Sequence, residues 1–322
     1  MNKQKRIKNL KRKNKYLTLK IKNLIKSNRN DTGVKTEINE NPIAYYKYTS
    51  QKVFLLLLKN KTIKITNPLK FNDPMDSTVP TIEVNNDWIK KITNSIIKEQ
   101  YPEYYNEFKS EFNEKFGSEF NKLKKEFEII NNKLMAEWPE LISNFRVLSL
   151  TTKEKNLLMW SHYADEHKGV VIKFKQKSSL GNPIKVDYYN GYQSLNNFFK
   201  KTFAYIAIRE MNNEISEKNI DNITNIMIKI MLNYFFMKMS EWSYENEYRI
   251  VYEKEHEKIK KINNNLDVLN ISDEDIECVI IGASVSPLRI KRLKFVINKR
   301  FPNAQIKLFR REGWHLKSEQ LN

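Results

Sequence analysis

The 322-residue sequence is poor in cysteine and glycine, and it has no long uninterrupted apolar run. Its single cysteine, Cys278, excludes an internal disulfide and favours a reducing compartment, so we expect a cytoplasmic protein. With only seven glycines and no Gly-rich phosphate loop, a glycine-rich dinucleotide fold is disfavoured. The most apolar window, residues 220–239, is interrupted by Lys and Asn, which is typical of a buried helix. We therefore expect no transmembrane segment and no cleaved secretion signal.

Acidic residues are missing from the first thirty positions, which hold twelve of the chain's 57 Lys and Arg residues. The remainder carries 45 basic and 38 acidic side chains, so the net charge of +19 is concentrated at the N-terminus. Such a segment attracts nucleic acid or another polyanion through its charge. Because Lys, Asn and Ile are abundant throughout, the composition bias of an AT-rich genome explains the same charge equally well. Both interpretations of residues 1–30 stay open.

The hydrophobic pattern predicts an α+β fold with a central mixed β-sheet flanked by long helices. Residues 1–41 are expected to form a basic tail and linker, and residues 42–322 a single domain with a helical insert at about 85–144. The expected strands are residues 43–48, 62–65, 146–151, 170–174, 183–188, the later part of 240–253, 277–281 and 305–309. The other expected helices are residues 50–58, 152–168, 194–239 and 287–300.

The most tightly specified stretch is residues 151–174. Thr151 and Glu154 have the spacing of a capping box, which predicts a helix over residues 152–168. Gly169 is expected to end this helix in a left-handed turn, and the apolar residues that follow predict a buried strand. The stretch is thus expected to run from helix through a sharp stop into a strand.

Within that helix, Trp160, Tyr163 and His167 fall on one face, and His162 falls on the opposite face. The two aromatic residues are more typical of core anchors than of a ligand-stacking surface. The two histidines also have a purely structural interpretation. His167 near a helix C-terminus favours the helix dipole, and His162 is in reach of Glu166 at the surface.

Two Asn/Asp-Pro pairs fix the loop over residues 67–76 with little conformational freedom. Rigid loops often carry binding residues, which makes Asn72 and Asp73 candidates for a site. The structural interpretation, which we favour here, is that these two residues and Pro74 only build a turn.

Several motifs together resemble a bacterial family called domain of unknown function 2971. They are YKY at 46–48, FNDPMD at 71–76, SLT at 149–151, LMWSHYADEHKGVVIKF at 158–174 and EWSYENEYR at 241–249. The resemblance spans about residues 43–309 and leaves out the basic tail and much of the insert at 85–144. It implies a bacterial origin and a cluster of marked residues, but it supplies no reaction.

Metal-dependent hydrolysis is the first function to weigh. His162 and His167 are five residues apart, whereas two metal ligands on one helix need a spacing of three or four. No pair of cysteines is present either. We therefore predict no metal cofactor. A ligand set of His167 with Glu247 and Asp73 from other elements stays open, but nothing in the spacing predicts it.

ADP-ribosyltransferase-like chemistry is the second function to weigh. A first strand with Tyr48 or Lys47, a strand with Ser149 and Thr151, and a late strand preceded by Glu-x-Glu are similar in order to that superfamily's arrangement. A carboxylate such as Glu247 could stabilise the oxocarbenium-like ribose that forms when nicotinamide leaves NAD. This interpretation makes the protein an NAD-using transferase or glycohydrolase. The family resemblance adds the expectation of an intracellular effector or phage-defence (abortive infection) role.

The alternative is a nucleic-acid-binding or nucleolytic module in which residues 1–30 bind phosphates and exposed aromatic side chains stack on bases. No feature of the sequence predicts the oligomeric state.

The candidate residues in these motifs lie at junctions between expected helices and strands, which suggests that they line one shared cleft. Glu247 and Arg249 could instead form a solvent-facing ion pair of little energetic weight. The candidates for catalysis are Glu247, His167 and His162, and those for substrate or NAD binding are Tyr48, Asn72, Asp73, Ser149, Thr151, Trp160, Tyr163 and Arg249.

Overall fold

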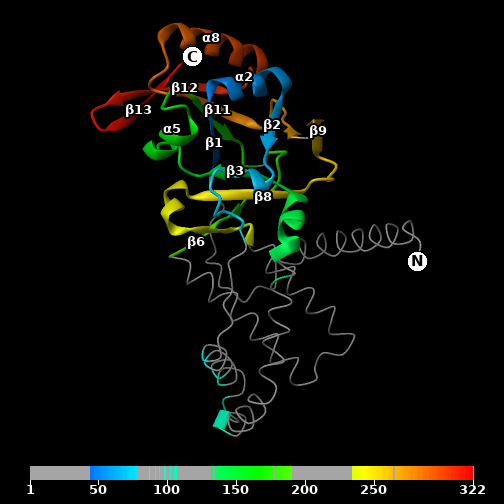
Figure 1. Cartoon of the computed structure of the whole chain (residues 1–322). Helices are drawn as coiled ribbons and strands as arrows, with labels where there is room; N and C mark the ends of the chain where they lie inside the picture. Colours follow the sequence, from blue (N-terminus) through cyan, green and yellow to red (C-terminus); the bar gives the residue numbers. More distant parts are fainter. Residues whose placement is uncertain are drawn as a thin grey trace, which may run out of the picture. The chain divides into compact units, whose positions relative to one another are not determined.

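The computed structural model describes residues 44–78, 135–176, 178–190, 234–263 and 265–321, with scattered positions between 87 and 132 (Figure 1). The expected basic tail at 1–41, most of the helical insert at 85–144 and most of the helix expected at 194–239 lie outside the described residues. None of the described helices is long and apolar enough to cross a membrane.

A mixed sheet of eight strands, in the order β13-β12-β11-β4-β1-β3-β8-β5, forms the centre of the described fold (Figure 1). Strands β11 and β12 are parallel, whereas the other neighbours are antiparallel. The predicted α+β class with a central mixed sheet is confirmed. The strands are β1 (Tyr45–Thr49), β3 (Phe145–Thr151), β4 (Val170–Phe174), β5 (Ile184–Lys185), β8 (Glu247–Glu253), β11 (Ile276–Ile281), β12 (Gln305–Glu312) and β13 (His315–Gln320).

Alternation along β8 gives this sheet one apolar face and one partly polar face. Tyr248 and Ile250 enter the main hydrophobic core, whereas Glu247 and Arg249 lie on the opposite face and contact each other. The same alternation places Leu148 and Leu150 of β3 in the core. The alternation along β8 therefore decides which side chains are free to build a polar site.

Helices α2 (Gln51–Asn60) and α8 (Pro287–Arg300) pack side by side over the apolar face (Figure 1). Ser50 caps α2, because its hydroxyl accepts a hydrogen bond from the backbone N–H of Val53 at 3.3 Å. Arg300 joins the two helices by donating to the carbonyl of Leu58 at 2.8 Å. A three-stranded sheet of β2 (Thr62–Ile65), β10 (Leu266–Asn270) and β9 (Ile259–Asn263) adds residues to the same core.

Helix α5 (Leu157–Tyr163) covers part of the other face with Trp160, which is fully buried. The indole packs edge-on against the ring of Tyr48 at 5.3 Å and lies near Phe309. Trp160 is therefore a core anchor and not a ligand-stacking surface. The remaining described elements are η1 (Pro68–Lys70), β6 (Asp187–Tyr189), β7 (Met237–Met239) and η3 (Ser240–Glu245), with β6 and β7 paired in parallel.

Helix α5 is shorter than the predicted helix at 152–168. The capping-box prediction is wrong, because the hydroxyl of Thr151 donates to the carbonyl of Glu245 at 2.6 Å and Thr151 remains in β3. Asn156 caps α5 instead, with its side-chain oxygen accepting from the N–H of Met159 at 3.1 Å. Because the hydroxyl of Thr151 is used in a long-range hydrogen bond, the helix begins at Leu157 and not near residue 152.

The turn after α5 also differs from the prediction. Asp165, Glu166 and His167 all have left-handed backbones, with φ of 52°, 54° and 66°, whereas Gly169 does not. Gly169 is needed for close approach instead, because a Cβ atom there would lie 2.3 Å from the carbonyl oxygen of Thr49. A Cβ on Gly282 would lie 2.1 Å from the carbonyl oxygen of His167. The absence of a side chain at these two glycines thus lets the turn lie close to β1 and to the end of β11.

The Gly282→Ala variant should be destabilised, since the obstructing atom is backbone and cannot rotate away. We expect the free energy of unfolding to fall by about 1–3 kcal/mol, measured by urea denaturation. Gly313→Asn is the matched control, because Gly313 has open space around it and a φ of 59° that Asn tolerates. Equal unfolding midpoints for Gly282→Ala and the wild type would contradict the close approach.

Candidate functional site

A cavity of about 290 Å³ lies beside β1, β3 and β8, under the loop that follows β2. Its size is close to the lower end of the range for small-molecule sites, about 300–1,000 Å³. Aromatic, acidic and basic side chains share its lining. They are Tyr46, Tyr48, Phe71 and Tyr163; Asp76, Glu245 and Glu247; and Lys47, Lys64, Lys70, Lys238 and Arg249.

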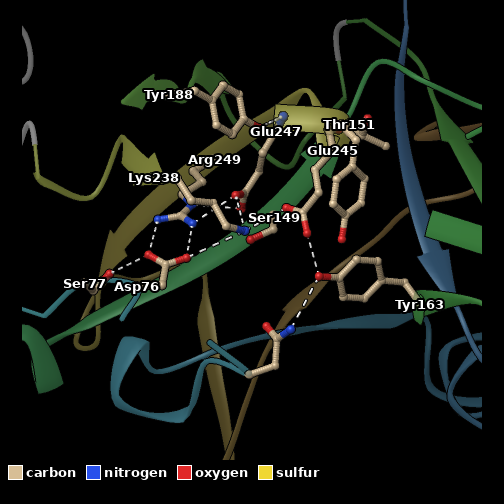
Figure 2. Close-up of polar contacts among 12 residues, drawn as sticks. Asp76, Ser77, Ser149, Thr151, Tyr163, Tyr188, Lys238, Glu245, Glu247 and Arg249 are labelled. Carbon is tan, nitrogen blue, oxygen red and sulfur yellow. Dashed lines mark hydrogen bonds and ion pairs between the residues drawn. The ribbon is translucent and has the colours of Figure 1, made fainter. Parts of the chain in front are cut away.

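Arg249 is the centre of a buried charge network and is 1% exposed (Figure 2). Its Nε and Nη2 donate to the two carboxylate oxygens of Glu247 at 2.8 and 2.9 Å. Its Nη1 and Nη2 donate to the carboxylate of Asp76 at 3.0 and 2.5 Å, and Nη1 also donates to the carbonyl of Phe235 at 2.9 Å. All five N–H donors of the guanidinium are thus satisfied, which is what a buried charge requires.

Lys238 links the two carboxylates at the start of β8. Its Nζ donates to Oε2 of Glu245 at 2.7 Å and to Oε2 of Glu247 at 3.2 Å. The ammonium also lies 4.9 Å from the ring centre of Trp242. On the other side, the hydroxyl of Tyr163 donates to Oε1 of Glu245 at 2.6 Å, and Figure 2 shows this ring facing the carboxylate. Two donors therefore fix the orientation of Glu245.

The pKa of Glu247 shows how strongly the network favours its charge. Burial raises this pKa, but the charge and hydrogen bonds of Arg249, the charge of Lys238 and a hydrogen bond from Ser149 outweigh burial and lower the pKa to about 2. With exposures of 4% and 1%, Glu247 and Arg249 are buried. The idea of a solvent-facing ion pair is therefore wrong.

Backbone contacts hold the start of β8 in place. The hydroxyl of Thr151 binds the carbonyl of Glu245, and the hydroxyl of Tyr188 accepts from the N–H of Glu247 at 2.7 Å. The hydroxyl of Tyr48 donates to the carbonyl of Lys153 at 2.8 Å. The hydroxyls of Thr151 and Tyr188 therefore hold the backbone of Glu245 and Glu247, whereas the hydroxyl of Tyr48 holds the segment after β3.

Three further lysines bring positive charge to the cavity. The ammonium of Lys47 donates to the carbonyl of Ser149 at 2.8 Å, while Lys64 and Lys70 are exposed. Burial lowers the pKa of Lys47, and the nearby charges of Glu247 and Glu245 act in the opposite direction. The lining holds five basic and three acidic residues, so it favours a ligand that carries negative charge.

Most of the predicted candidates line the cavity, together with three residues that were not among those candidates: Asp76, Lys238 and Glu245, the last of which was expected only as the first member of the Glu-x-Glu motif. Asp76 and Glu245 stand inside the quoted motifs FNDPMD and EWSYENEYR, where that signal could have identified them. Lys238 had no such signal, since it lies on β7 in a region predicted to be helical. The predicted candidates that line the cavity are Tyr48, Asn72, Ser149, Thr151, Tyr163, Glu247 and Arg249.

Four predicted candidates do not line this cavity, so the expectation of one shared cleft is wrong for them. Trp160 is in the core, and Asp73 forms the favoured turn by accepting from the N–H of Met75 at 2.9 Å. His162 is exposed beside the ring of Tyr244. His167 stacks on Trp160 and lines a different cavity.

Among the described residues, no group of three or more His, Cys, Asp or Glu side chains is arranged to hold a metal ion. The possible ligand-binding groups of the cavity are its carboxylates, its lysines and its aromatic rings.

A family model described as protein of unknown function (DUF2971) matches residues 159–250. This match confirms the resemblance over the stretch that supplies Tyr163, Lys238, Glu245, Glu247 and Arg249 to the cavity. No curated protein and no solved structure matches the chain. The comparisons thus connect the cavity wall with a family, and they supply no reaction.

The charge of Glu247 predicts a pH dependence of stability. Its pKa is 4.5 ordinarily and about 2 in the folded chain, so on acidification the unfolded chain binds this proton first. The stabilisation is complete above pH 4.5 and is lost as pH falls through 2. In Glu247→Gln, the free energy of unfolding should be lower at neutral pH and should decline less steeply between these values.

Urea unfolding at several pH values would measure this difference. Glu241→Gln on η3 is the matched control, because Glu241 is exposed and lies outside the network. If the free energy of unfolding of Glu247→Gln fell with pH as steeply as that of the wild type, the carboxylate of Glu247 would not be held charged by its partners.

Proposed function

We propose that the cavity binds NAD and that the protein is an ADP-ribosyltransferase or an NAD glycohydrolase. Three features expected for such chemistry lie around one cavity: Tyr48 on β1, Ser149 and Thr151 on β3, and Glu245 just before β8. Strands β1, β3 and β8 are neighbours in the sheet. This convergence supports the proposal more strongly than the order of the motifs along the sequence does.

The observation that carries the proposal is the arrangement of Glu245. Its two oxygens accept from Lys238 and Tyr163, and each oxygen keeps one further lone pair. Glu245 is 4% exposed, and it lines an aromatic cavity in which a charge acts through a low dielectric. A carboxylate held in this way can accept a ribose hydroxyl and stabilise positive charge at the ribose.

Glu247 has a different part in this proposal. Its oxygens already accept from Arg249, Lys238 and Ser149, so little acceptor capacity is left for a ligand. We assign ligand contact to Glu245 and positioning to Glu247, which anchors Lys238 and Arg249. The histidines predicted to be catalytic lie outside the cavity and have no part in this chemistry.

The rest of the lining matches the chemistry of a dinucleotide. Tyr163 and Phe71 offer ring surface for the nicotinamide, and burial, followed by Glu245, raises the pKa of Tyr163 and keeps its hydroxyl protonated. Lys64 and Lys70 are placed to attract phosphates. At about 290 Å³ the cavity suits the nicotinamide ribose, with the remainder of NAD at its mouth.

The reaction breaks the bond between ribose C1′ and the nicotinamide nitrogen. Nicotinamide leaves as a neutral molecule with the bonding electron pair, and the oxocarbenium-like ribose is stabilised by Glu245. Water or an acceptor group then bonds to C1′ and loses a proton to solvent. Such consumption of NAD fits the effector or phage-defence role that the family resemblance implies.

Nicotinamide release from NAD by the purified full chain tests the proposal. Glu245→Gln should reduce the release rate by at least about 100-fold, because the neutral amide no longer stabilises the ribose cation. The exposed Glu241→Gln on the same short helix is the matched control and should keep the wild-type rate. Thermal unfolding of both variants checks that the fold is kept. Absence of release by the wild type, or full activity of Glu245→Gln, would refute the assignment.

The basic N-terminus favours a second candidate, nucleic-acid binding or nucleolytic action. Its twelve basic residues within the first thirty positions give a purely electrostatic reason for affinity. Removing residues 1–30 should weaken binding to a single-stranded oligonucleotide by at least about tenfold at low salt and should reduce the salt dependence. Fluorescence anisotropy at several salt concentrations measures both. If oligonucleotide affinity and its salt dependence were unchanged without residues 1–30, the positive charge of this segment would reflect composition bias alone.

A further inference from the structure

A second cavity, of about 530 Å³, lies between the turn after α5, the loop after β11 and the hairpin of β12 and β13. Its polar and aromatic lining comes from His167, Ser284, Arg311, Trp314 and His315. It shares no lining residue with the cavity at β8. It therefore needs an explanation of its own, independent of NAD chemistry.

The floor of this cavity is rigid because His167 is fixed on several sides. Its backbone N–H donates to the carbonyl of Trp160 at 3.1 Å, and its carbonyl accepts from the N–H of Ser284 at 3.0 Å. Its imidazole stacks on the indole of Trp160 with ring centres 6.0 Å apart and an angle of 13°. The left-handed backbone at His167 and at the two preceding residues is costly, and such conformations persist where surrounding contacts enforce them. The imidazole is thus held in position before any ligand binds.

The charge of the cavity favours an anion. In the part of the chain that the structure describes, the guanidinium of Arg311 has no carboxylate partner, whereas the adjacent Arg310 pairs with Glu319 at 2.6 Å. No Asp or Glu lines the cavity. Burial, and then the charge of Arg311, lower the pKa of His167, so its ring is neutral near pH 7. Arg311 is therefore the group best placed to bind a phosphate.

The rim of the cavity offers an aromatic surface. Trp314 lies in the turn between β12 and β13 and is 92% exposed. Its indole contacts no other aromatic ring among the described residues. A large aromatic ring beside an unpaired guanidinium is the combination that binds nucleotides, since the ring stacks on a base while the cation holds the phosphate.

We propose that this cavity binds a nucleoside phosphate, with Arg311 on the phosphate, Trp314 stacked on the base, and His167 and Ser284 as hydrogen-bonding groups. The nucleotide could be a free mononucleotide or one unit of a single-stranded nucleic acid, because both present the same base and phosphate. In either case the hairpin of β12 and β13 is a ligand-binding element.

Isothermal titration calorimetry of the full chain with AMP tests the proposal. Arg311→Ala and Trp314→Ala should each weaken AMP binding by roughly tenfold or more, because each removes one of the two main contacts. Arg310→Ala is the matched control, since Arg310 is the neighbouring residue and is paired with Glu319; AMP binding should be unchanged. All three variants should release nicotinamide at the wild-type rate, because none of these residues lines the first cavity.

Titrations with further ligands show which chemical class of ligand the cavity binds, and whether the nucleotide is free or part of a nucleic acid. Weaker binding of inorganic phosphate and of adenosine than of AMP would support recognition of both parts. Tighter, salt-sensitive binding of a short single-stranded oligonucleotide would identify nucleic acid as the source, and tighter binding of AMP would identify a free nucleotide. No AMP binding at millimolar concentration, equal losses in Arg310→Ala and Arg311→Ala, or phosphate binding equal to AMP binding would overturn the proposal.

Discussion

The buried guanidinium of Arg249 is the interaction on which the polar side of this fold depends. A charge at 1% exposure is stable only when its donors are all used, and here Glu247, Asp76 and the carbonyl of Phe235 use them. These partners come from β8, from the loop after β2 and from the residues before β7. Asp76 is 173 residues away from Arg249 in sequence. One side chain thus holds together the segments that enclose the first cavity (Figure 2).

The same network separates the roles of two carboxylates that stand two residues apart. Glu247 points into the cluster and is held charged by Arg249 and Lys238. Glu245 precedes the strand, so the alternation of β8 does not decide its direction. Its carboxylate is instead fixed by Lys238 and Tyr163. A structural ion pair therefore presents a second, less occupied carboxylate to the cavity, which is a common way to preorganise a site.

The segment from α5 to β4 serves two cavities within a few residues. Trp160 is buried in the core, while Tyr163 reaches Glu245 at the first cavity. The left-handed turn then directs His167 to the second cavity. Gly169 and Gly282 allow the backbones to approach closely enough to hold that turn. Many candidate residues fall in this stretch because it contributes to the core, to the first cavity and to the second cavity.

Local pattern in the sequence determined much of the fold. The alternation of β8, the Ser50 cap of α2 and the extent of α8 follow from spacing and capping, because neighbouring residues decide them. Strands β2 and β3 were predicted to within one residue for the same reason. The grouping of Thr151 and Glu247 was also accessible, since Thr151 ends β3 and Glu247 begins β8.

Only the tertiary structure decided which of these residues form one site. Thr151 failed as a helix cap because a distant carbonyl at Glu245 binds its hydroxyl. Glu247 and Arg249 are buried because Lys238 on β7 and Asp76, which is 173 residues from Arg249, neutralise them. His167 lies away from Glu247 because three left-handed residues redirect the chain. The sequence by itself set the alternation of each strand, but burial and charge pairing depend on contacts between residues far apart in the chain, which no local spacing encodes.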